Sequence, residues 1–399
     1  MIDKKIRGLK IVSIFCAIIL IIEIFYIGYS VFCKNRVSLY FDGINAIENN
    51  NSYYVTVGSN NDNSNFYEKA KISKYNDKME KTFEKLYNVG YNSTFLGVAL
   101  DGDSVVAVGS YEKTKKDHSN SVRRALFVRY NSKGDVEFEK DFKVLDNSKF
   151  TSIAVLEDGY LITGQSIYRN TKVGDLSGGA ILCKYDKEGN LLWYKTYGNN
   201  KSAIFNDLLI IDDSVFTVGM DTNYLGILCK YDMEGNFISY NDYKYTDDIG
   251  FSGITSIDDT IYVSGSARIG EITNALIVTY DTDCTYLDQV VHKTKRGTVR
   301  YNKLVVDSNQ NLIAIGICFT KRKFNNHTAD TFNYDGIIGK YNSSLEELQV
   351  IPYGDEKDDY FTDIKIVNGE YYVVGYSSYE DGSYLSKFIR YSDALKLLG

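Results

Sequence analysis

The sequence predicts an all-β protein, a seven-bladed β-propeller of four-stranded antiparallel blades preceded by one N-terminal transmembrane helix. Three observations lead to this prediction. A strand motif with a glycine step recurs seven times, tyrosine occurs 35 times, and a single long apolar segment lies near the N-terminus. Tyrosine favours half-buried strand positions, so the composition indicates β-structure. The chain has 1 proline, which excludes proline-rich linkers.

The N-terminal residues predict where the protein resides. Residues 1–10 contain four basic residues, and residues 11–33 form an apolar segment interrupted by Glu23. At about 1.5 Å per residue this segment is long enough to cross a bilayer, and the basic flank keeps the N-terminus in the cytoplasm. We therefore expect a single-pass cell-membrane protein. Residues 34–40 would form a linker and closing strand, and residues 41–399 an extracellular propeller.

A cleaved signal peptide is the alternative interpretation of the apolar segment. Gly28 and Ser30 provide small residues at the −3 and −1 positions of a cleavage site. The apolar run is longer than the usual signal-peptide core of about 7–15 residues, which favours a retained signal anchor. A lipoprotein is excluded, because Phe32 precedes Cys33 and Phe15 precedes Cys16 where a small residue is required.

The charge balance limits the classes of partner. The formal net charge is −7, and residues 1–36 hold six basic and two acidic residues, so the outer part carries −11. An acidic domain does not attract polyanions, which argues against nucleic acid as a partner. The richness in Ile, Asn, Lys and Tyr is associated with AT-rich bacterial genomes, so we expect a bacterial cell-envelope protein.

Seven copies of one strand motif predict the architecture. Each copy is an apolar run that ends in a small-residue step, as in SVVAVGS and TIYVSGS. The steps are separated by 46 to 59 residues and fall at Gly58, Gly109, Gly164, Gly219, Gly265, Gly316 and Gly375. An apolar segment precedes each copy, and a strand ending in Tyr follows it, as in LCKY before residue 186. Several copies then pass through an Asp/Asn and Gly turn into a fourth strand.

Four short strands in a unit of about 50 residues are typical of a β-propeller blade. A β-solenoid needs much shorter repeats, and a helical repeat needs a 3.6-residue period that these windows lack. The last copy ends soon after Tyr391, whereas residues 36–41 precede the first copy without a unit of their own. We expect these N-terminal residues to complete the last blade and cover its edge strand.

One segment supports a resemblance to known proteins. KYDKEGNLLWYKTYG (184–198), preceded by DGYLITGQS, resembles the bacterial β-propeller repeat of secreted and membrane-bound surface proteins, and more widely the quinoprotein-like propellers. The resemblance covers all seven units loosely and the third unit best, where Trp193 matches the motif's tryptophan. It implies the fold, and because the motif's positions are structural it implies no catalytic residue.

The loops between the second and third strands form the predicted binding face, because propellers commonly carry function on such loops. In units two and six these loops concentrate basic and aromatic residues within an acidic domain, which favours an acidic partner. The alternative is a solvated surface whose charges only keep the protein soluble. The candidate binding residues are Tyr111, Lys115, Lys116, Arg123, Arg124, Tyr168, Arg169, Phe319, Lys321, Arg322, Lys323 and Phe324.

No catalytic residue, metal or cofactor is assigned. The sequence contains no GxSxG, HExxH, P-loop or dinucleotide fingerprint, and His118 and His327 lie on loops of non-adjacent units. Cys183 and Cys229 occupy equivalent places in neighbouring units, and we expect them to be buried thiols.

These features favour a membrane-tethered extracellular module that binds a protein or a cell-envelope component and lean against enzymatic activity. Two alternatives stay open. One is an enzyme on the same ring, either a quinoprotein-like dehydrogenase or a glycan-active enzyme. The other is a scaffold for a membrane complex.

Overall fold

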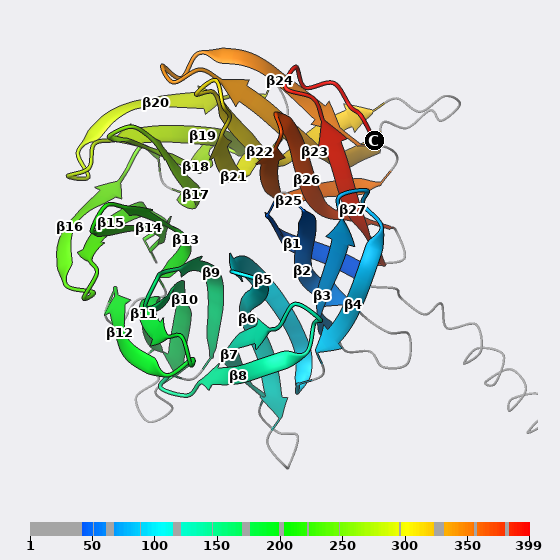
Figure 1. Ribbon diagram of the computed structural model, residues 1–399. Helices are drawn as coiled ribbons and strands as arrows, with labels where there is room; N and C mark the ends of the chain where they lie inside the picture. The colour runs from blue at the N-terminus through cyan, green and yellow to red at the C-terminus, as the bar shows by residue number, and fades with distance from the viewer. Residues whose placement is uncertain are drawn as a thin grey trace, which may run out of the picture. The chain divides into compact units, whose positions relative to one another are not determined.

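The computed structural model describes residues 42–399 except residues 51, 61–67, 88, 115–120, 146, 170–175, 199–202, 222, 247, 295–296, 323–330, 355–356 and 380–382. Within these residues, seven antiparallel sheets are arranged as a ring around a central axis (Figure 1), which confirms the predicted seven-bladed β-propeller. The predicted transmembrane helix 11–33 and the predicted closing strand 36–41 lie outside the described residues. In the part of the chain that the structure describes, no helix has the length and apolarity needed to cross a membrane.

Consecutive strands form each blade, with the first strand nearest the axis and the last at the rim (Figure 1). Blade 1 contains β1 (Asp42–Asn49), β2 (Tyr53–Asn60), β3 (Lys69–Asn76) and β4 (Lys81–Tyr87), and blade 2 contains β5 (Tyr91–Asp101), β6 (Ser104–Thr114), β7 (Ser121–Tyr130) and β8 (Val136–Phe142). Blade 3 contains β9 (Ser148–Val155), β10 (Gly159–Arg169), β11 (Leu176–Asp186) and β12 (Leu191–Tyr197), and blade 4 contains β13 (Ile204–Ile211), β14 (Ser214–Met220), β15 (Gly226–Asp232) and β16 (Phe237–Tyr243). Blades 5 to 7 contain β17 (Ile249–Ile257), β18 (Thr260–Ile269), β19 (Ile272–Tyr280), β20 (Tyr286–His292); β21 (Val299–Val306), β22 (Leu312–Arg322), β23 (Thr331–Tyr341), β24 (Glu347–Tyr353); β25 (Asp358–Val367), β26 (Glu370–Ser378) and β27 (Tyr384–Tyr391).

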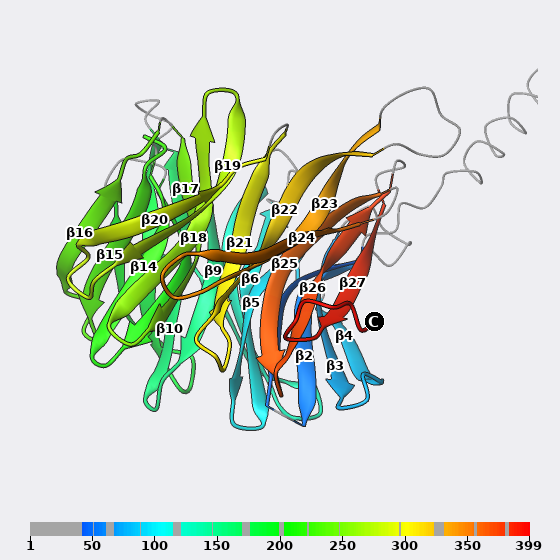
Figure 2. The same ribbon diagram turned by 90° about the horizontal axis from the view of Figure 1, so that it is seen from above.

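The two ends of the ring carry different connections, because the strands of each blade alternate in direction. The connections from second to third strands and from blade to blade lie at one end, which we call the B–C end. The β18–β19 hairpin marks this end at the top of Figure 2. The predicted binding loops of units two and six therefore belong to the B–C end.

Blade 7 differs from the other blades, because its sheet has three strands within the described residues. After β27 the chain turns, Leu397 forms a single bridge with Tyr391, and the Arg390 N–H donates to the Gly399 carbonyl at 2.6 Å. Residues 397–399 thus lie along β27 in the position where a fourth strand begins in other blades. Completion of this blade by residues 36–41 stays a prediction.

The hydrophobic core of the described residues is divided into seven clusters, one between each pair of adjacent blades. The middle strands are buried on both faces, whereas the fourth strands are largely exposed. Cys183 and Cys229 lie fully buried and unpaired in neighbouring blades 3 and 4, which confirms the prediction of buried thiols.

The repeated glycines of the second strands have a steric cause. In every blade the first strand carries a β-bulge opposite this glycine. In blade 4 the bulged residue is Asn206, which has no partner in the strand ladder, whereas Phe205 and Asp207 on either side do. A Cβ atom on Gly219 would overlap the carbonyl oxygen of Ile204 in the neighbouring strand. The glycine step is therefore the position where the first and second strands approach each other most closely.

The bulged residue of one blade reaches the next blade. Its side chain donates a hydrogen bond to the backbone carbonyl at the equivalent bulge of the following blade, at 2.6–2.7 Å in five places among the described residues. The donors and acceptors are Asn45 and Phe95, Thr151 and Phe205, Asn206 and Phe251, Asn302 and Phe361, and Thr362 and Ile44. The last of these bonds joins blade 7 to blade 1, so it helps to close the ring.

Candidate functional site

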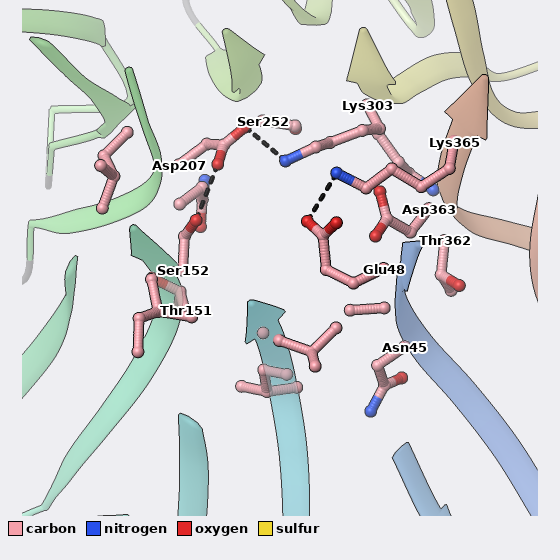
Figure 3. Close-up of a pocket in the computed structure, with 18 residues that line it drawn as sticks. Asn45, Glu48, Thr151, Ser152, Asp207, Ser252, Lys303, Thr362, Asp363 and Lys365 are labelled. Atoms are coloured by element: carbon pink, nitrogen blue, oxygen red, sulfur yellow. Dashed lines mark hydrogen bonds and ion pairs between the residues drawn. The ribbon is translucent and has the colours of Figure 1, made fainter. Parts of the chain in front are cut away.

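The central channel holds a polar pocket of about 280 Å³ (Figure 3). The first strands of all seven blades contribute lining residues, because the first strand of each blade lies nearest the axis (Figure 1). The side chains that face one another across it include Glu48, Asp207, Lys303, Asp363 and Lys365.

Ion pairs and hydrogen bonds connect most of these charged groups to one another. The Lys303 Nζ lies 2.7 Å from Asp207 Oδ2, and Ser152 Oγ donates to Asp207 Oδ1 at 2.9 Å (Figure 3). A second ion pair joins Lys365 Nζ and Glu48 Oε1 at 2.6 Å. The Lys303 pair links blade 6 to blade 4 and passes the intervening blade 5, where Gly253 occupies the equivalent position.

Burial lowers the pKa of Lys303, but the nearby carboxylates of Asp207, Asp363 and Glu48 outweigh this effect and hold the pKa above its usual range. Asp363 accepts backbone hydrogen bonds from Ile47 at 2.9 Å and from its neighbour Ile364 at 2.9 Å. The charged groups of the channel thus form most of their ion pairs and hydrogen bonds with other groups of the protein. These interactions connect blades across the axis.

The described ranges contain no group of three or more His, Cys, Asp or Glu side chains placed to hold a metal ion. His118 and His327 lie outside the described residues.

A second pocket, of about 290 Å³, lies at the B–C end between blades 2 and 3. Its lining residues come from β6, β7, β10 and the beginning of β9, and they are Glu112, Ser121, Arg123, Asn147, Lys149 and Gln165. We call this site the blade 2–3 pocket. Its charged groups are two cations and one carboxylate, in a domain whose overall charge is negative.

The two cations of the blade 2–3 pocket differ in their partners. Arg123 Nη2 lies 3.6 Å from Glu112 Oε1, and the Arg123 backbone N–H donates to Asn147 Oδ1 at 3.3 Å. Lys149 is partly buried and forms no ion pair or hydrogen bond through its side chain with another described residue. Burial, together with the nearby Arg123, lowers the pKa of Lys149.

A row of aromatic side chains lies at the B–C end between blades 6 and 7 and continues along blade 7. We call it the aromatic row. The ring centroids of successive members are 5.2, 6.0, 4.9 and 5.5 Å apart. All members are partly exposed, and in order they are Phe319, Tyr334, Tyr360, Tyr376 and Tyr384.

The blade 2–3 pocket and most of the aromatic row use the same positions of the repeat. Counted from the glycine step and the bulge, Glu112, Arg123, Lys149 and Gln165 are equivalent to Phe319, Tyr334, Tyr360 and Tyr376. One backbone framework therefore presents charged groups at one blade junction and a row of contacting aromatic rings at another.

The structure separates the predicted binding residues into three groups. The side chains of Tyr111, Arg123, Arg124 and Phe319 are described, and Arg123 and Phe319 belong to the blade 2–3 pocket and the aromatic row, respectively. Only the strand positions are described for Tyr168, Arg169, Lys321 and Arg322. The remaining predicted residues, Lys115, Lys116, Lys323 and Phe324, lie outside the described residues.

Tyr111 and Arg124 lie on the face of blade 2 that packs against blade 1, away from Arg123. Tyr111 is only 8% exposed, its ring belongs to the core between blades 1 and 2, and its hydroxyl donates to Asp141 Oδ2 at 3.3 Å. Arg124 pairs with Tyr111 across the strands, and successive residues of a strand point to opposite faces. Neighbouring basic residues in the sequence thus belong to different blade junctions.

The residues that complete these two sites were missed by sequence reasoning. All of them lie in strands: Lys149, Tyr334, Tyr360 and Tyr376 fall outside the predicted binding loops, and Gln165, at the start of the predicted loop of unit three, was not selected as a binding residue. The signal that could have found them is their offset from the repeat: Lys149 and Tyr360 each directly precede the first-strand phenylalanine of their unit.

The arrangement of blades defines this protein as a seven-bladed β-propeller. No protein family and no curated protein matches the chain. Solved structures do match it, at low sequence identity. The β-propeller domain of the trilobed protease from Pyrococcus furiosus, described as having an open velcro topology, matches with a TM-score of 0.50 and 10% identity over 88% of this chain and 93% of that one.

Two further structures are similar to the same extent. Sqt1 from Chaetomium thermophilum matches with a TM-score of 0.50 and 12% identity over 89% of this chain and 84% of that one. A prolyl endopeptidase structure matches with a TM-score of 0.51 and 10% identity over 90% of this chain, which spans about half (48%) of that one. At such identities the likeness supports the fold alone.

Proposed function

We propose that this protein is a membrane-tethered, extracellular binding module whose B–C end contacts a protein or another component of a bacterial cell envelope. The apolar segment 11–33 after four basic residues supports the tether and the orientation. The proposal concerns binding by the ring, with no chemical step assigned to it.

The observation that carries the proposal is the aromatic row. Tyrosine and phenylalanine side chains provide large contact areas with few rotatable bonds, and they are enriched at the centres of protein interfaces. Five of them lie in contact on one end of the ring while remaining partly exposed. Burial beside Asp358 raises the pKa of Tyr360 to about 12, so its hydroxyl stays protonated and can donate a hydrogen bond to a ligand.

The test is capture from solubilised native envelope with the full-length chain as bait. The first variant combines Tyr334→Ser and Tyr376→Ser, which removes the second and fourth of the five rings in the aromatic row. The control is Tyr240→Ser, because Tyr240 is an exposed aromatic residue (52%) that lies outside the aromatic row, on the rim strand β16.

We expect one partner to be retained by the unmodified chain and by the control, and its retention to fall at least about tenfold with the double variant, since each lost aromatic anchor costs about 1–2 kcal/mol. Unchanged thermal unfolding of the variant would show that its ring remains folded. Equal retention by all three baits, or by none, contradicts the proposed binding end.

A further inference from the structure

The blade 2–3 pocket contains an unbalanced positive charge. Arg123 and Lys149 face the same space, and Glu112 is the lining carboxylate, at 3.6 Å from Arg123. The pocket therefore has a formal charge of +1, within an outer domain of −11. Among the described residues Lys149 has no counter-ion, and a partly buried ammonium close to a second cation is stabilised when an anion occupies the space between them.

The uncharged lining residues complete an anion site. Asn147 uses its Oδ1 to accept the backbone N–H of Arg123, which leaves its amide Nδ2 as a donor. Gln165 and Ser121 add an amide and a hydroxyl on the same lining. The pocket thus offers charged and neutral donors from two adjacent blades, and hydrogen bonds from charged donors to a carboxylate are the strongest of this kind.

We propose that the blade 2–3 pocket binds a single carboxylate group, supplied by an acidic side chain of a protein partner. This inference rests on the proposed function, and it names the chemistry of one contact at the B–C end. A net charge of +1 matches a monoanion. A polyanion would be repelled by the rest of the acidic domain, which disfavours a phosphate polymer as the source.

The repeat provides an internal comparison for this assignment. At the junction of blades 6 and 7, the equivalent four positions hold aromatic rings in contact with one another, namely Phe319, Tyr334, Tyr360 and Tyr376. Because aromatic residues occupy the equivalent positions there, the fold itself does not require charged residues at these positions. The cations of the blade 2–3 pocket are a local feature, and no described residue forms an ion pair or hydrogen bond with the partly buried Lys149 side chain.

The test is a titration followed by NMR on the full-length chain, with lysine side chains observed through ¹³C-methyl groups added by reductive methylation. The probes are the peptide Ac-Gly-Glu-Gly-NH2, its uncharged match Ac-Gly-Gln-Gly-NH2, and inorganic phosphate. The variant Lys149→Gln identifies the Lys149 signal by its loss. Lys133, exposed in a turn at the opposite end of the ring, provides the control signal and the control variant Lys133→Gln.

We expect the glutamate peptide to shift the Lys149 signal saturably, with a dissociation constant of about 1 mM or lower. The Lys149 pKa should rise on saturation, because the bound carboxylate stabilises the charged amine. Arg123→Gln should weaken binding about tenfold, whereas Lys133→Gln should leave it unchanged.

Three results overturn the inference. The Lys149 signal could fail to saturate by about 10 mM glutamate peptide, which is roughly ten times the expected constant. The glutamine peptide could shift it equally. Inorganic phosphate could bind more tightly than the glutamate peptide, which would reassign the pocket to phosphate. Each of these results leaves the capture experiment on the aromatic row unaffected, so failure of this inference and failure of the proposed function can be distinguished.

Discussion

Asp307 is a buried carboxylate at the end of β21 that joins blades 6 and 7. Its Oδ2 lies 3.0 Å from Lys340 Nζ and accepts a hydrogen bond from the Tyr371 hydroxyl at 3.0 Å. The backbone N–H of Asn311 donates to its other oxygen at 2.8 Å. Burial alone would raise the Asp307 pKa, but these hydrogen bonds and the Lys340 charge lower it to about 2.

Because the folded-state pKa of Asp307 lies below the ordinary value of about 3.9, the carboxylate stabilises the fold above that pH, and this contribution is lost as the pH falls towards 2. We expect Asp307→Asn to lower the free energy of unfolding by about 1–2 kcal/mol at pH 7. The variant should also lose less stability than the unmodified chain between pH 5 and 2. Urea unfolding at a series of pH values measures both effects.

The control for this experiment is Asp213→Asn, which changes an exposed carboxylate in the first turn of blade 4. It should leave the free energy of unfolding and its acid dependence close to those of the unmodified chain. If the two asparagine variants behave alike, the bonds of Asp307 do not contribute to stability as argued.

Sequence reasoning at the residue scale predicted single residues better than their partners. It selected Arg123 and Phe319, because a basic or aromatic residue in a loop of an acidic domain is visible in the sequence. Lys149 lies 26 positions after Arg123 on another blade, and their proximity follows from the packing of two sheets. Arg124 was predicted for the same binding face as Arg123. Successive side chains of a strand point to opposite faces, so Arg124 faces the junction with blade 1 and Arg123 faces the junction with blade 3.

At the scale of the element, the close approach at the glycine step predicts that two neighbouring glycines of one blade tolerate alanine to different degrees. In blade 5, a Cβ atom on Gly265 would overlap the carbonyl oxygen of Gly250, whereas a Cβ atom on Gly250 would make an ordinary contact 3.7 Å from Met220 Sδ. The two glycines lie on adjacent strands one register position apart, because Gly250 pairs with Ser266 and Gly265 with Phe251, so they provide two neighbouring test positions.

We expect Gly265→Ala to lower the free energy of unfolding by about 2–3 kcal/mol, because the added methyl group forces the bulge of β17 away from β18. Gly250→Ala should leave it unchanged or raise it by about 0.5 kcal/mol, because alanine restricts the unfolded chain. Chemical denaturation of both variants measures the difference. Similar costs at the two positions would contradict the close approach at the bulge.

The elements themselves were largely predictable from the sequence, and their irregularities were not. The spacing of Gly219 and Gly265 and the tyrosines that end the third strands mark blades because they repeat. The bulge at Asn206 and its bond to the next blade depend on a backbone distortion that no local pattern of hydrophobicity records. The channel pair of Asp207 and Lys303 joins non-adjacent blades, so it became visible only with the ring.

At the scale of the whole molecule, the junction between blades 7 and 1 has the smallest of the seven hydrophobic clusters that the described residues form. Its cluster contains six buried hydrophobic residues, whereas the cluster between blades 4 and 5 contains fourteen. Opposite the glycine step, blades 2 to 6 place leucine or isoleucine, but blades 1 and 7 place Lys71 and Lys387. Burial lowers the pKa of Lys71 to about 8, so the charged amine opposes folding at neutral pH.

This junction should therefore be the place where the ring opens first. In hydrogen exchange of the full-length chain, we expect the amides of β1 and β27 to exchange at least about tenfold faster than those of β14 and β18, which correspond to a difference of about 1.4 kcal/mol in local opening. The bond from Thr362 to Ile44 and that from Ile47 to Asp363 still join the two blades, so the protection should be reduced and not abolished. Equal protection in all four strands would mean that the seven junctions open as one cooperative unit. The smaller core and the buried Lys71 would then not weaken the junction between blades 7 and 1.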